Sequence, residues 1–524
     1  MVISDRLRTN AATLALQSLT KRFLWTCVPS FLQSPLSAAS TPAAPLTTAR
    51  AAAARPGRTP YLDGLRGVAA LCVVLCHLIW TYHGWIEYGW GDGPSNRRII
   101  QLPPLRLAYA GHAMVSLFFV VGGYVSSARA IRLARNRQHE KVYLALTSSL
   151  FRRAIRLYAP ALVATFVTMW TIRLGLWEPA RQYVAMPYMF MPDNHHVRLP
   201  SLGEQLEDWW GHAMGLTNVW SYYNHSFWQP YYNPYDPHLW TVPMEMRGSL
   251  VVMLALLALL RCRVGWRFVL MALIVVFCVY WDRWECMEFV VGAMLAEGHM
   301  IVAEAGASTE DYGNTGQVDG QDLCRSRSNE GAETTDSLLE KPAWDVFTVS
   351  PLQVVTRWTS QGIRRCLRIT LFVLALYVFS APNHRYEFAT GYGIFPYLVP
   401  RSISDPKRFI HGIGSALLIM SVSCTPTLQR MFDHAVPQYL GKISYALYIC
   451  HGPVIHMVGM YLTPTIWSVV GYETMTSWLF GFLVGSSVVI VVVFWAADLF
   501  WRVVDMRCVA FARWFEGICF EKSE

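Results

Sequence analysis

The class of fold follows from the stretch Tyr61-Leu-Asp-Gly-Leu-Arg-Gly-Val-Ala-Ala-Leu-Cys-Val-Val-Leu-Cys-His77, an apolar run that contains Arg66 and His77. With the residues that follow, it has the roughly 20 mostly apolar positions that a membrane-spanning helix needs. Arg66 and His77 are eleven residues apart, which places them on one helical face about 16 Å apart along the axis. Asp63, one turn before Arg66, is positioned to pair with it. Because ionisable side chains in membrane helices are rare and usually functional, this helix is the first candidate for an active site.

Similar apolar segments recur along the chain of 524 residues, of which 53% are hydrophobic and only 15% charged. A soluble domain usually has about 25% charged residues, so the composition favours an all-α polytopic membrane protein. The pattern predicts a bundle of about ten transmembrane helices. They are expected at residues 62–82, 107–128, 154–176, 239–260, 265–281, 284–303, 367–381, 409–424, 439–461 and 477–500.

The basic residues beside these segments predict the orientation of the chain. Lys and Arg number 44 against 35 Asp and Glu, an excess that in a soluble protein would suggest nucleic acid. Here the basic residues cluster in alternate connections, which is typical of cytosolic loops, so no nucleic-acid partner is expected and both termini are placed in the cytosol. Segment 177–238 is then a long lumenal loop, and its Asn224-His225-Ser226 fits a glycosylation acceptor. The host membrane is expected to be an endomembrane or the plasma membrane.

The expected organisation has five parts. The basic tail 1–58 is predicted to be disordered, although its composition also fits an organelle transit peptide. Residues 59–303 form the first membrane part with six spans, and 304–345 form a disordered cytosolic insertion rich in small and polar residues. Residues 346–505 form the second membrane part with four spans, and 506–524 are a cytosolic tail. The twelve Cys include no CxxC pair, so we expect neither a metal site nor a disulfide framework.

Two further charged groups lie at the ends of predicted spans. Arg153 and Arg156 are one turn apart at the cytosolic end of the third span, where a guanidinium pair suits a phosphate-bearing ligand. Positive-inside topology is the alternative explanation for that pair. Glu245 lies in Pro237-His-Leu-Trp-Thr-Val-Pro-Met-Glu-Met-Arg247, at the lumenal end of the fourth span. It is a candidate for orienting a catalytic group or for pairing with an Arg, and a local pair with Arg247 is the simplest alternative.

Five segments stand out in chain order. They are Asp63-Gly-Leu-Arg-Gly with His77, Phe118-Phe-Val-Val-Gly-Gly-Tyr124, Arg153-Ala-Ile-Arg156, Leu239-Trp-Thr-Val-Pro-Met-Glu-Met-Arg247 and Leu440-Gly-Lys-Ile-Ser-Tyr-Ala-Leu-Tyr-Ile-Cys-His451. Together these segments resemble the membrane acyltransferase 3 family, and the resemblance extends from about residue 58 to residue 500. Gly122 stands in the second segment where the family commonly has Ser, which removes a hydroxyl but keeps a small side chain.

The family resemblance implies acyl transfer, often of acetyl, from acyl-CoA to a hydroxyl on a sugar, lipid or small metabolite. Acetyl-CoA is then the expected co-substrate, and the lipid bilayer and the acceptor are the other partners. The resemblance makes His77 the catalytic residue with Arg66 as its partner, and it makes Arg153 and Arg156 ligands of acyl-CoA. An imidazole with a reference pKa near 6.5 suits a general base. We expect Glu245 to orient this imidazole or to hold the acceptor.

Two other classes of protein share some of these features. A proton-coupled membrane transporter also uses buried His, Glu and Arg in a helix bundle. A non-catalytic receptor or scaffold would tolerate neutral residues in place of Arg153 and Arg156. Labelling of an acceptor by acyl-CoA separates the enzyme from both, because a transporter leaves its substrate unmodified.

Overall fold

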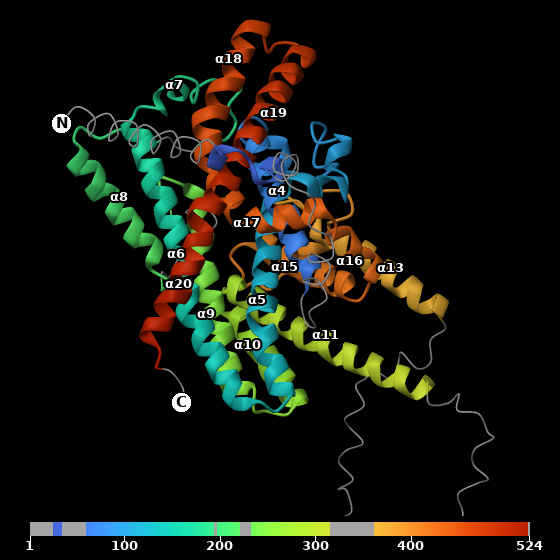
Figure 1. The fold of residues 1–524 in the computed structure, drawn as a ribbon. Helices are drawn as coiled ribbons and strands as arrows, with labels where there is room; N and C mark the ends of the chain where they lie inside the picture. Colours follow the sequence, from blue (N-terminus) through green and yellow to red (C-terminus); the bar gives the residue numbers. More distant parts are fainter. Residues whose placement is uncertain (1–24, 34–58, 193–195, 221–231, 315–360, 522–524) are drawn as a thin grey trace, which may run out of the picture.

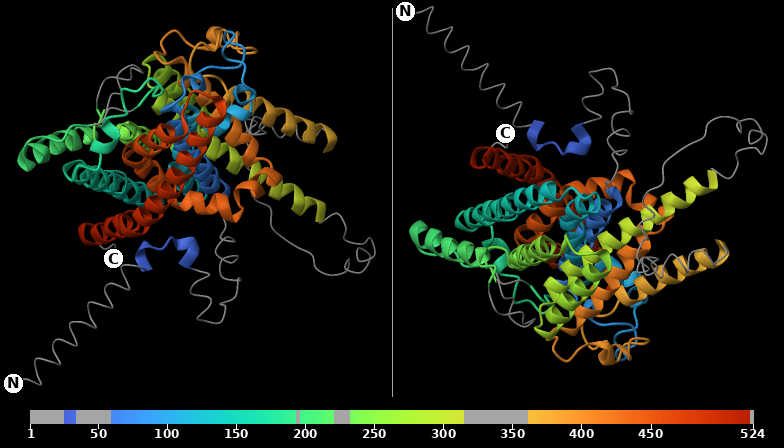
Figure 2. Two further views of the ribbon diagram at one scale, coloured as in Figure 1. Left: turned by 90° about the horizontal axis from the view of Figure 1, so that it is seen from above. Right: turned by 90° about the horizontal axis from the view of Figure 1, so that it is seen from below.

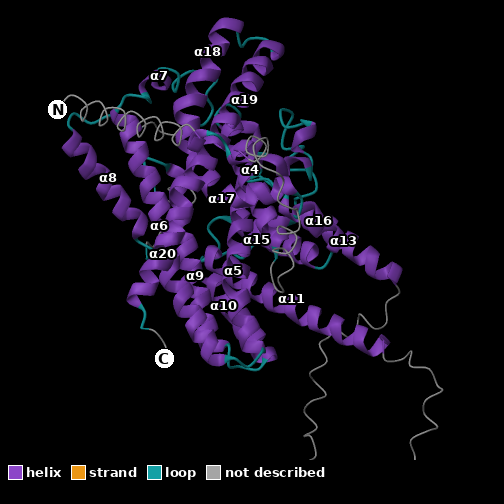
Figure 3. Ribbon diagram, viewed as in Figure 1, coloured by secondary structure: helices purple, strands orange, loops and turns teal. Residues whose placement is uncertain are grey.

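The computed structural model describes residues 25–33, 59–192, 196–220, 232–314 and 361–521. These residues form helices and loops without any strand (Figure 3). The longer helices are α4 (Pro60–Trp80), α5 (Gly111–Arg135), α6 (His139–Arg173), α8 (Leu202–Thr217), α9 (Thr241–Leu259), α10 (Val264–Tyr280), α11 (Trp284–Asn314), α13 (Gln361–Phe379), α15 (Pro406–Ser423), α16 (Pro426–Phe432), α17 (Ala435–Val454), α18 (Met460–Val470), α19 (Met475–Phe500) and α20 (Met506–Cys519).

Seven helices in the described part of the chain are long and apolar enough to span a membrane. The number is eight if α15 and α16, which meet at a break with a bend of 105°, count as one span. Each of the ten expected spans falls on a helix, but α10 has only 17 residues and α13 does not meet the same test. Apolar side chains such as Leu273, Phe277 and Val491 are more than half exposed, as expected for surfaces that lipid covers. The prediction of an all-α polytopic membrane bundle is confirmed.

Close helix contacts at small residues build the centre of the bundle. A Cβ atom at Gly67 of α4 would collide with the backbone of Gly441 in α17, and one at Gly441 would collide with the backbone of Asp63. Gly123 of α5 and Gly292 of α11 are matched in the same way, because each would strike the backbone of the facing helix. Such contacts let membrane helices approach until their backbones touch. They fix α4 against α17, and α5 against α11.

The connections of the bundle lie at two opposite ends (Figure 1). The α5–α6 and α9–α10 connections, at 136–138 and 260–263, lie at the lower end in this view, and the α18–α19 turn lies at the upper end. These two connections, which carry Arg137 and the pair Arg261 and Arg263, therefore share one end. Helices α11 and α13 project together from one side, as the views from above and below also show (Figures 1 and 2).

Several expected boundaries differ from the helices that form. Helix α11 continues to Asn314, into the expected insertion, of which residues 315–345 lie outside the described residues. In the expected N-terminal tail, residues 25–33 contact α19, where the Ser30 backbone N–H donates to Asp498 at 2.9 Å. In the expected C-terminal tail, α20 packs against α6. The glycosylation pattern at Asn224 lies outside the described residues, and the eleven described cysteines are all free thiols.

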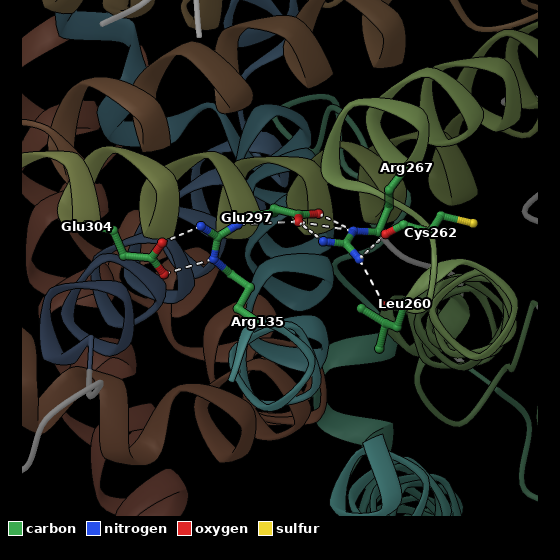
Figure 4. A network of polar contacts seen from close by, with 6 residues as sticks. All are labelled: Arg135, Leu260, Cys262, Arg267, Glu297 and Glu304. Carbon is green, nitrogen blue, oxygen red and sulfur yellow. Dashed lines mark hydrogen bonds and ion pairs between the residues drawn. The ribbon is translucent and has the colours of Figure 1, made fainter. Parts of the chain in front are cut away.

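A buried ionic network ties α5, α10 and α11 together (Figure 4). Glu297 of α11 is fully buried and accepts from Arg267 Nε of α10 at 2.8 Å, and Arg135 of α5 lies 3.8 Å from the same carboxylate. Arg135 also donates to Glu304 at 2.8 Å. The Arg267 guanidinium donates to the carbonyls of Leu260 and Cys262 just after α9 at 3.1 and 3.3 Å. One arginine therefore neutralises a buried acid and satisfies two carbonyls at the end of a helix.

Candidate active site

His77 lies in the last turn of α4, which ends at Trp80. Arg66 lies eleven residues earlier, or about 16 Å along the helix axis. Its guanidinium is 3.8 Å from the Asp63 carboxylate, so the pair expected from the sequence is present. Arg66 and His77 therefore contact different groups at different heights of one helix.

A second histidine joins His77 to a buried carboxylate. The Nδ1 atom of His77 lies 3.1 Å from Nε2 of His238, which is within hydrogen-bond distance. The Nδ1 atom of His238 lies 3.0 Å from Oδ1 of Asp236, and the same oxygen accepts the His238 backbone N–H at 3.1 Å. Asp236 and His238 are only 1% and 4% exposed. A continuous chain of hydrogen-bond contacts thus runs from Asp236 to His77.

His451 of α17 completes a cluster of three imidazoles. Its ring centroid lies 5.2 Å from that of His77 and 4.5 Å from that of His238. The Nδ1 atom of His451 lies 2.6 Å from the Tyr448 carbonyl oxygen, and because a carbonyl can only accept, this nitrogen carries a hydrogen. One nitrogen from each ring lies within 4.8 Å of the other two. The spacing is also compatible with three ligands of one metal ion, which the sequence does not predict.

A cavity of about 330 Å³ lies between α4, α5, α6, α9 and α17. It also reaches Thr241 and Tyr448, whose hydroxyls are 2.7 Å apart. The Tyr448 hydroxyl donates in addition to the backbone carbonyl of His238. The cavity therefore joins a strongly basic wall to residues that contact the histidine cluster. The basic side chains of the wall are Arg66, Arg152, Arg153, Arg156 and Lys442.

The acids of this region are paired differently from the simplest expectation. Glu245 lines the cavity and lies 3.2 Å from Arg153 of α6, so it pairs with an Arg. The local pair with Arg247 is absent, because Arg247 bonds to the buried Glu285 at 2.8 Å. The carboxylate that contacts the imidazole beside His77 is that of Asp236, whereas Glu245 belongs to the arginine wall.

The structure brings together four of the five predicted site residues, since Arg66, Arg153, Arg156 and Glu245 all line the cavity. The fifth, His77, lies beyond Thr241 and Tyr448 in the histidine cluster. A larger cavity of about 690 Å³ between α13 and α16 is lined by none of these residues.

Sequence reasoning did not single out Asp236 and His238, which contact the His77 side chain directly or through one residue. The signal was present as Asp236-Pro-His238, an acid and a histidine placed directly before an apolar helix. Their connection to His77 joins positions 161 residues apart. Only the folded chain shows that contact.

Comparison with known proteins identifies the class. The acyltransferase 3 family model, described as an acyltransferase domain, matches residues 59–312 and 346–496. This is well over half of the chain, so the protein belongs to the acyltransferase 3 family. Together with its membrane helices, this membership makes the chain an integral, multi-pass membrane acyltransferase. The transporter and the scaffold alternatives are not supported.

Three fungal proteins are similar over most of their length. The chain is 26% identical over 466 residues to the O-acetyltransferase PaAT-1 of Phomopsis amygdali, covering 87% of this chain and 84% of that protein. It is 24% identical over 486 residues to the acyltransferase clz18 of Cochliobolus lunatus, covering 86% and 95% of the two chains. It is 24% identical over 490 residues to the acyltransferase R4 of a Phoma species, covering 87% and 95%. No solved structure matches the chain.

Proposed function

We propose that the protein transfers an acyl group, with acetyl as the first candidate, from acyl-CoA to a hydroxyl on a sugar, lipid or small metabolite, with His77 as the general base. The observation that carries this proposal is the cavity whose wall combines five basic side chains with residues that contact the histidine cluster. Guanidinium forks match phosphate oxygens, and CoA is rich in phosphate. The name of the O-acetyltransferase relative supports acetyl as the group transferred.

The separation between Arg66 and His77 fits such a donor. The pantetheine arm of CoA holds the thioester far from the phosphates, so the groups that bind phosphate and the group that handles protons have to lie apart. In the proposed arrangement Arg153 and Arg156 bind the phosphates, and the thioester lies toward Thr241 and Tyr448. Arg66 belongs to the same basic wall, so we assign it to the donor as well.

The chemical step follows from these positions. His77 removes the proton of the acceptor hydroxyl as the oxygen attacks the thioester carbonyl. The new C–O bond forms, the C–S bond breaks, and the CoA thiolate leaves with the proton that His77 returns. Glu245 competes with the phosphates for Arg153, to which it is paired at 3.2 Å. Neutralising a cation in this way limits the repulsion within the basic wall before acyl-CoA binds.

The decisive experiment uses the full chain in lipid nanodiscs. The purified protein is incubated with radiolabelled acetyl-CoA and an extract of cells that lack the protein. The products are compared by mass spectrometry with the products found in extracts of cells that contain the protein. The proposal predicts one or more acceptors that gain an acetyl mass shift and a radiolabel. His77→Ala protein should still bind acetyl-CoA and should form no product. His384→Ala is the matched control, because this histidine side chain is 58% exposed and lies outside the cluster.

Two outcomes would contradict the proposal. An acceptor that crosses the membrane without modification would indicate transport. Normal transfer by the folded His77→Ala protein would remove His77 from the role of base.

A further inference from the structure

We infer that Asp236 and His238 form a hydrogen-bond relay with His77, in which both act as positioning residues that hold the electron pair of His77 on its Nε2 atom. The inference rests on the proposed function, since it explains how His77 is kept as a base. It adds two residues from the short segment that lies directly before α9.

The hydrogen of His238 is fixed by Asp236. Oδ1 of Asp236 faces the backbone N–H of His238 at 3.1 Å and its Nδ1 at 3.0 Å. A carboxylate oxygen accepts, so Nδ1 of a neutral His238 carries the hydrogen and Nε2 carries the electron pair. Because of the Asp236 carboxylate, the Nε2 atom of His238 is a hydrogen-bond acceptor, and this atom faces His77.

The hydrogen of His77 follows from the same logic. Its Nδ1 atom faces the electron pair of His238 Nε2 at 3.1 Å, so His77 has to donate from Nδ1. A neutral His77 then has its electron pair on Nε2, as a general base requires. Serine hydrolases orient their catalytic histidine by a carboxylate on the opposite ring nitrogen. In this protein one more imidazole stands between the carboxylate and the base.

The surrounding residues hold this chain of groups in place. Asp236 caps the short helical turn Pro237–Trp240, which leads directly into α9. Tyr448 donates its hydroxyl to the His238 carbonyl and contacts the Thr241 hydroxyl at 2.7 Å. Gly452 of α17 lies directly against the pair, because a Cβ atom there would be 2.5 Å from His238 Nδ1 and 2.9 Å from Asp236 Oδ1. The Asp236–His238 pair therefore occupies the space where a side chain at position 452 would be.

The relay balances protons during acyl transfer. When His77 Nε2 takes the hydroxyl proton, the new positive charge is shared through its Nδ1–H with His238 and is compensated by the Asp236 carboxylate. When the C–S bond breaks, the same proton leaves Nε2 for the CoA sulfur. The ring hydrogens of His77 and His238 are then where they began, and no oxidant or further reactant is needed.

A metal ion bound by the three histidines is the competing explanation, and it requires the opposite arrangement of hydrogens. A metal would need the electron pair of His77 on Nδ1, whereas the relay needs a hydrogen there. Ligand nitrogens about 2.0–2.1 Å from a tetrahedral zinc ion lie roughly 3.3–3.4 Å apart. The 3.1 Å between His77 and His238 is a hydrogen-bond distance, so the geometry favours the relay.

The first test replaces Asp236 by Asn in the full chain in nanodiscs. The Asn amide can donate to His238 Nδ1, which would move the hydrogen of His238 to Nε2 and that of His77 away from Nδ1. We expect kcat to fall by roughly a hundred- to ten-thousand-fold, while KM and direct binding of acetyl-CoA change less than twofold. The pH profile of kcat should also lose the change that protonation of His77 causes in the wild-type protein. The matched control is Asp208→Asn, which changes a carboxylate that also contacts a histidine, His196, at 2.8 Å but lies outside the site.

The second test needs no activity. In protein labelled with ¹⁵N-histidine, NMR spectra in nanodiscs distinguish a nitrogen that carries hydrogen from one that does not, and His77→Gln and His238→Gln variants assign the signals. The relay predicts hydrogen on Nδ1 of both rings, and elemental analysis should find no stoichiometric metal. If the wild-type protein acylates nothing, the proposed function fails while this test still reports on the relay. Hydrogen on His238 Nε2, one bound metal ion per chain, or wild-type kcat in Asp236→Asn protein would each overturn the relay.

Discussion

Gly452→Ala tests the histidine site without replacing Asp236, His238 or His77. The added Cβ atom would lie 2.5 Å from His238 Nδ1, whereas ordinary contacts begin at 3.4 Å, so the ring must retreat by about 0.9 Å. Asp236 Oδ1, at 2.9 Å from the same Cβ, must shift as well. A misplacement of about 1 Å costs roughly a hundredfold in rate, which corresponds to about 2.7 kcal/mol of lost transition-state stabilisation. We therefore expect kcat to fall about a hundredfold.

The assay compares acetyl-CoA consumption, acceptor labelling and acetyl-CoA binding in nanodiscs. Binding should be unchanged, because the nearest atoms that a Cβ at Gly452 would meet belong to His238 and Asp236 and not to the basic wall of the cavity. Gly298→Ala is the control, since a Cβ atom at this helical glycine of α11 would meet no atom within 4 Å. A Gly452→Ala protein that folds and keeps more than half of the wild-type kcat would refute the role of the Asp236–His238 pair.

Three further predictions concern the rest of the molecule. Arg153→Gln and Arg156→Gln should each raise KM for acetyl-CoA about tenfold or more with little change in kcat, because a hydrogen bond to a charged group contributes about 1.5–3 kcal/mol. Arg267→Met should lower the free energy of unfolding by about 3–5 kcal/mol, measured by thermal unfolding in detergent, because Glu297 remains buried without its main partner. Burial raises the pKa of Glu87 above its ordinary value of 4.5, so the stability it contributes is present below that value and is lost as pH rises through the folded pKa. Glu87→Gln should remove this dependence of the melting temperature on pH.

Each of these predictions has a control or an opposing outcome. Arg385→Gln, at a side chain that is 59% exposed, should leave KM unchanged, and an unchanged KM in the Arg153→Gln and Arg156→Gln proteins would argue against the donor site. Combining Arg267→Met with Glu297→Met should recover most of the lost stability, and failure to recover would mean that packing rather than charge explains the loss. If the melting temperature of Glu87→Gln protein still depended on pH in the same way, that dependence would come from other titratable groups.

Much of the fold could be predicted because lipid imposes strict rules on sequence. Each expected span falls on a helix, since a membrane segment must satisfy its backbone internally and show an apolar surface. The ends were less predictable, because polar residues permit helix as well as loop. Helix α11 thus continues to Asn314, and α20 forms where a tail was expected.

Gly122, which departs from the family pattern, faces the Phe289 ring, where a Cβ atom would come within 2.9 Å.

The site was predictable where a single helix carries the pattern. Arg153 and Arg156 lie one turn apart on α6, and both line the cavity as their spacing indicates. The partners of His77 were not predictable, because His238 lies 161 residues away and His451 is in α17. The partner of Glu245 could not be predicted either. Arg247 is close in sequence, but Glu245 pairs with Arg153 and Arg247 pairs with Glu285. Contacts between distant helices depend on packing, which no local pattern encodes.

The joint projection of α11 and α13 has a practical consequence for anyone who wishes to purify this enzyme. The family match is interrupted between residues 312 and 346, in the connection that links these two helices. None of the residues proposed for the donor cavity or the histidine cluster comes from α11, α13 or that connection. An affinity tag or a fluorescent protein inserted there would leave both regions untouched, and it would give a handle for following the enzyme in living cells.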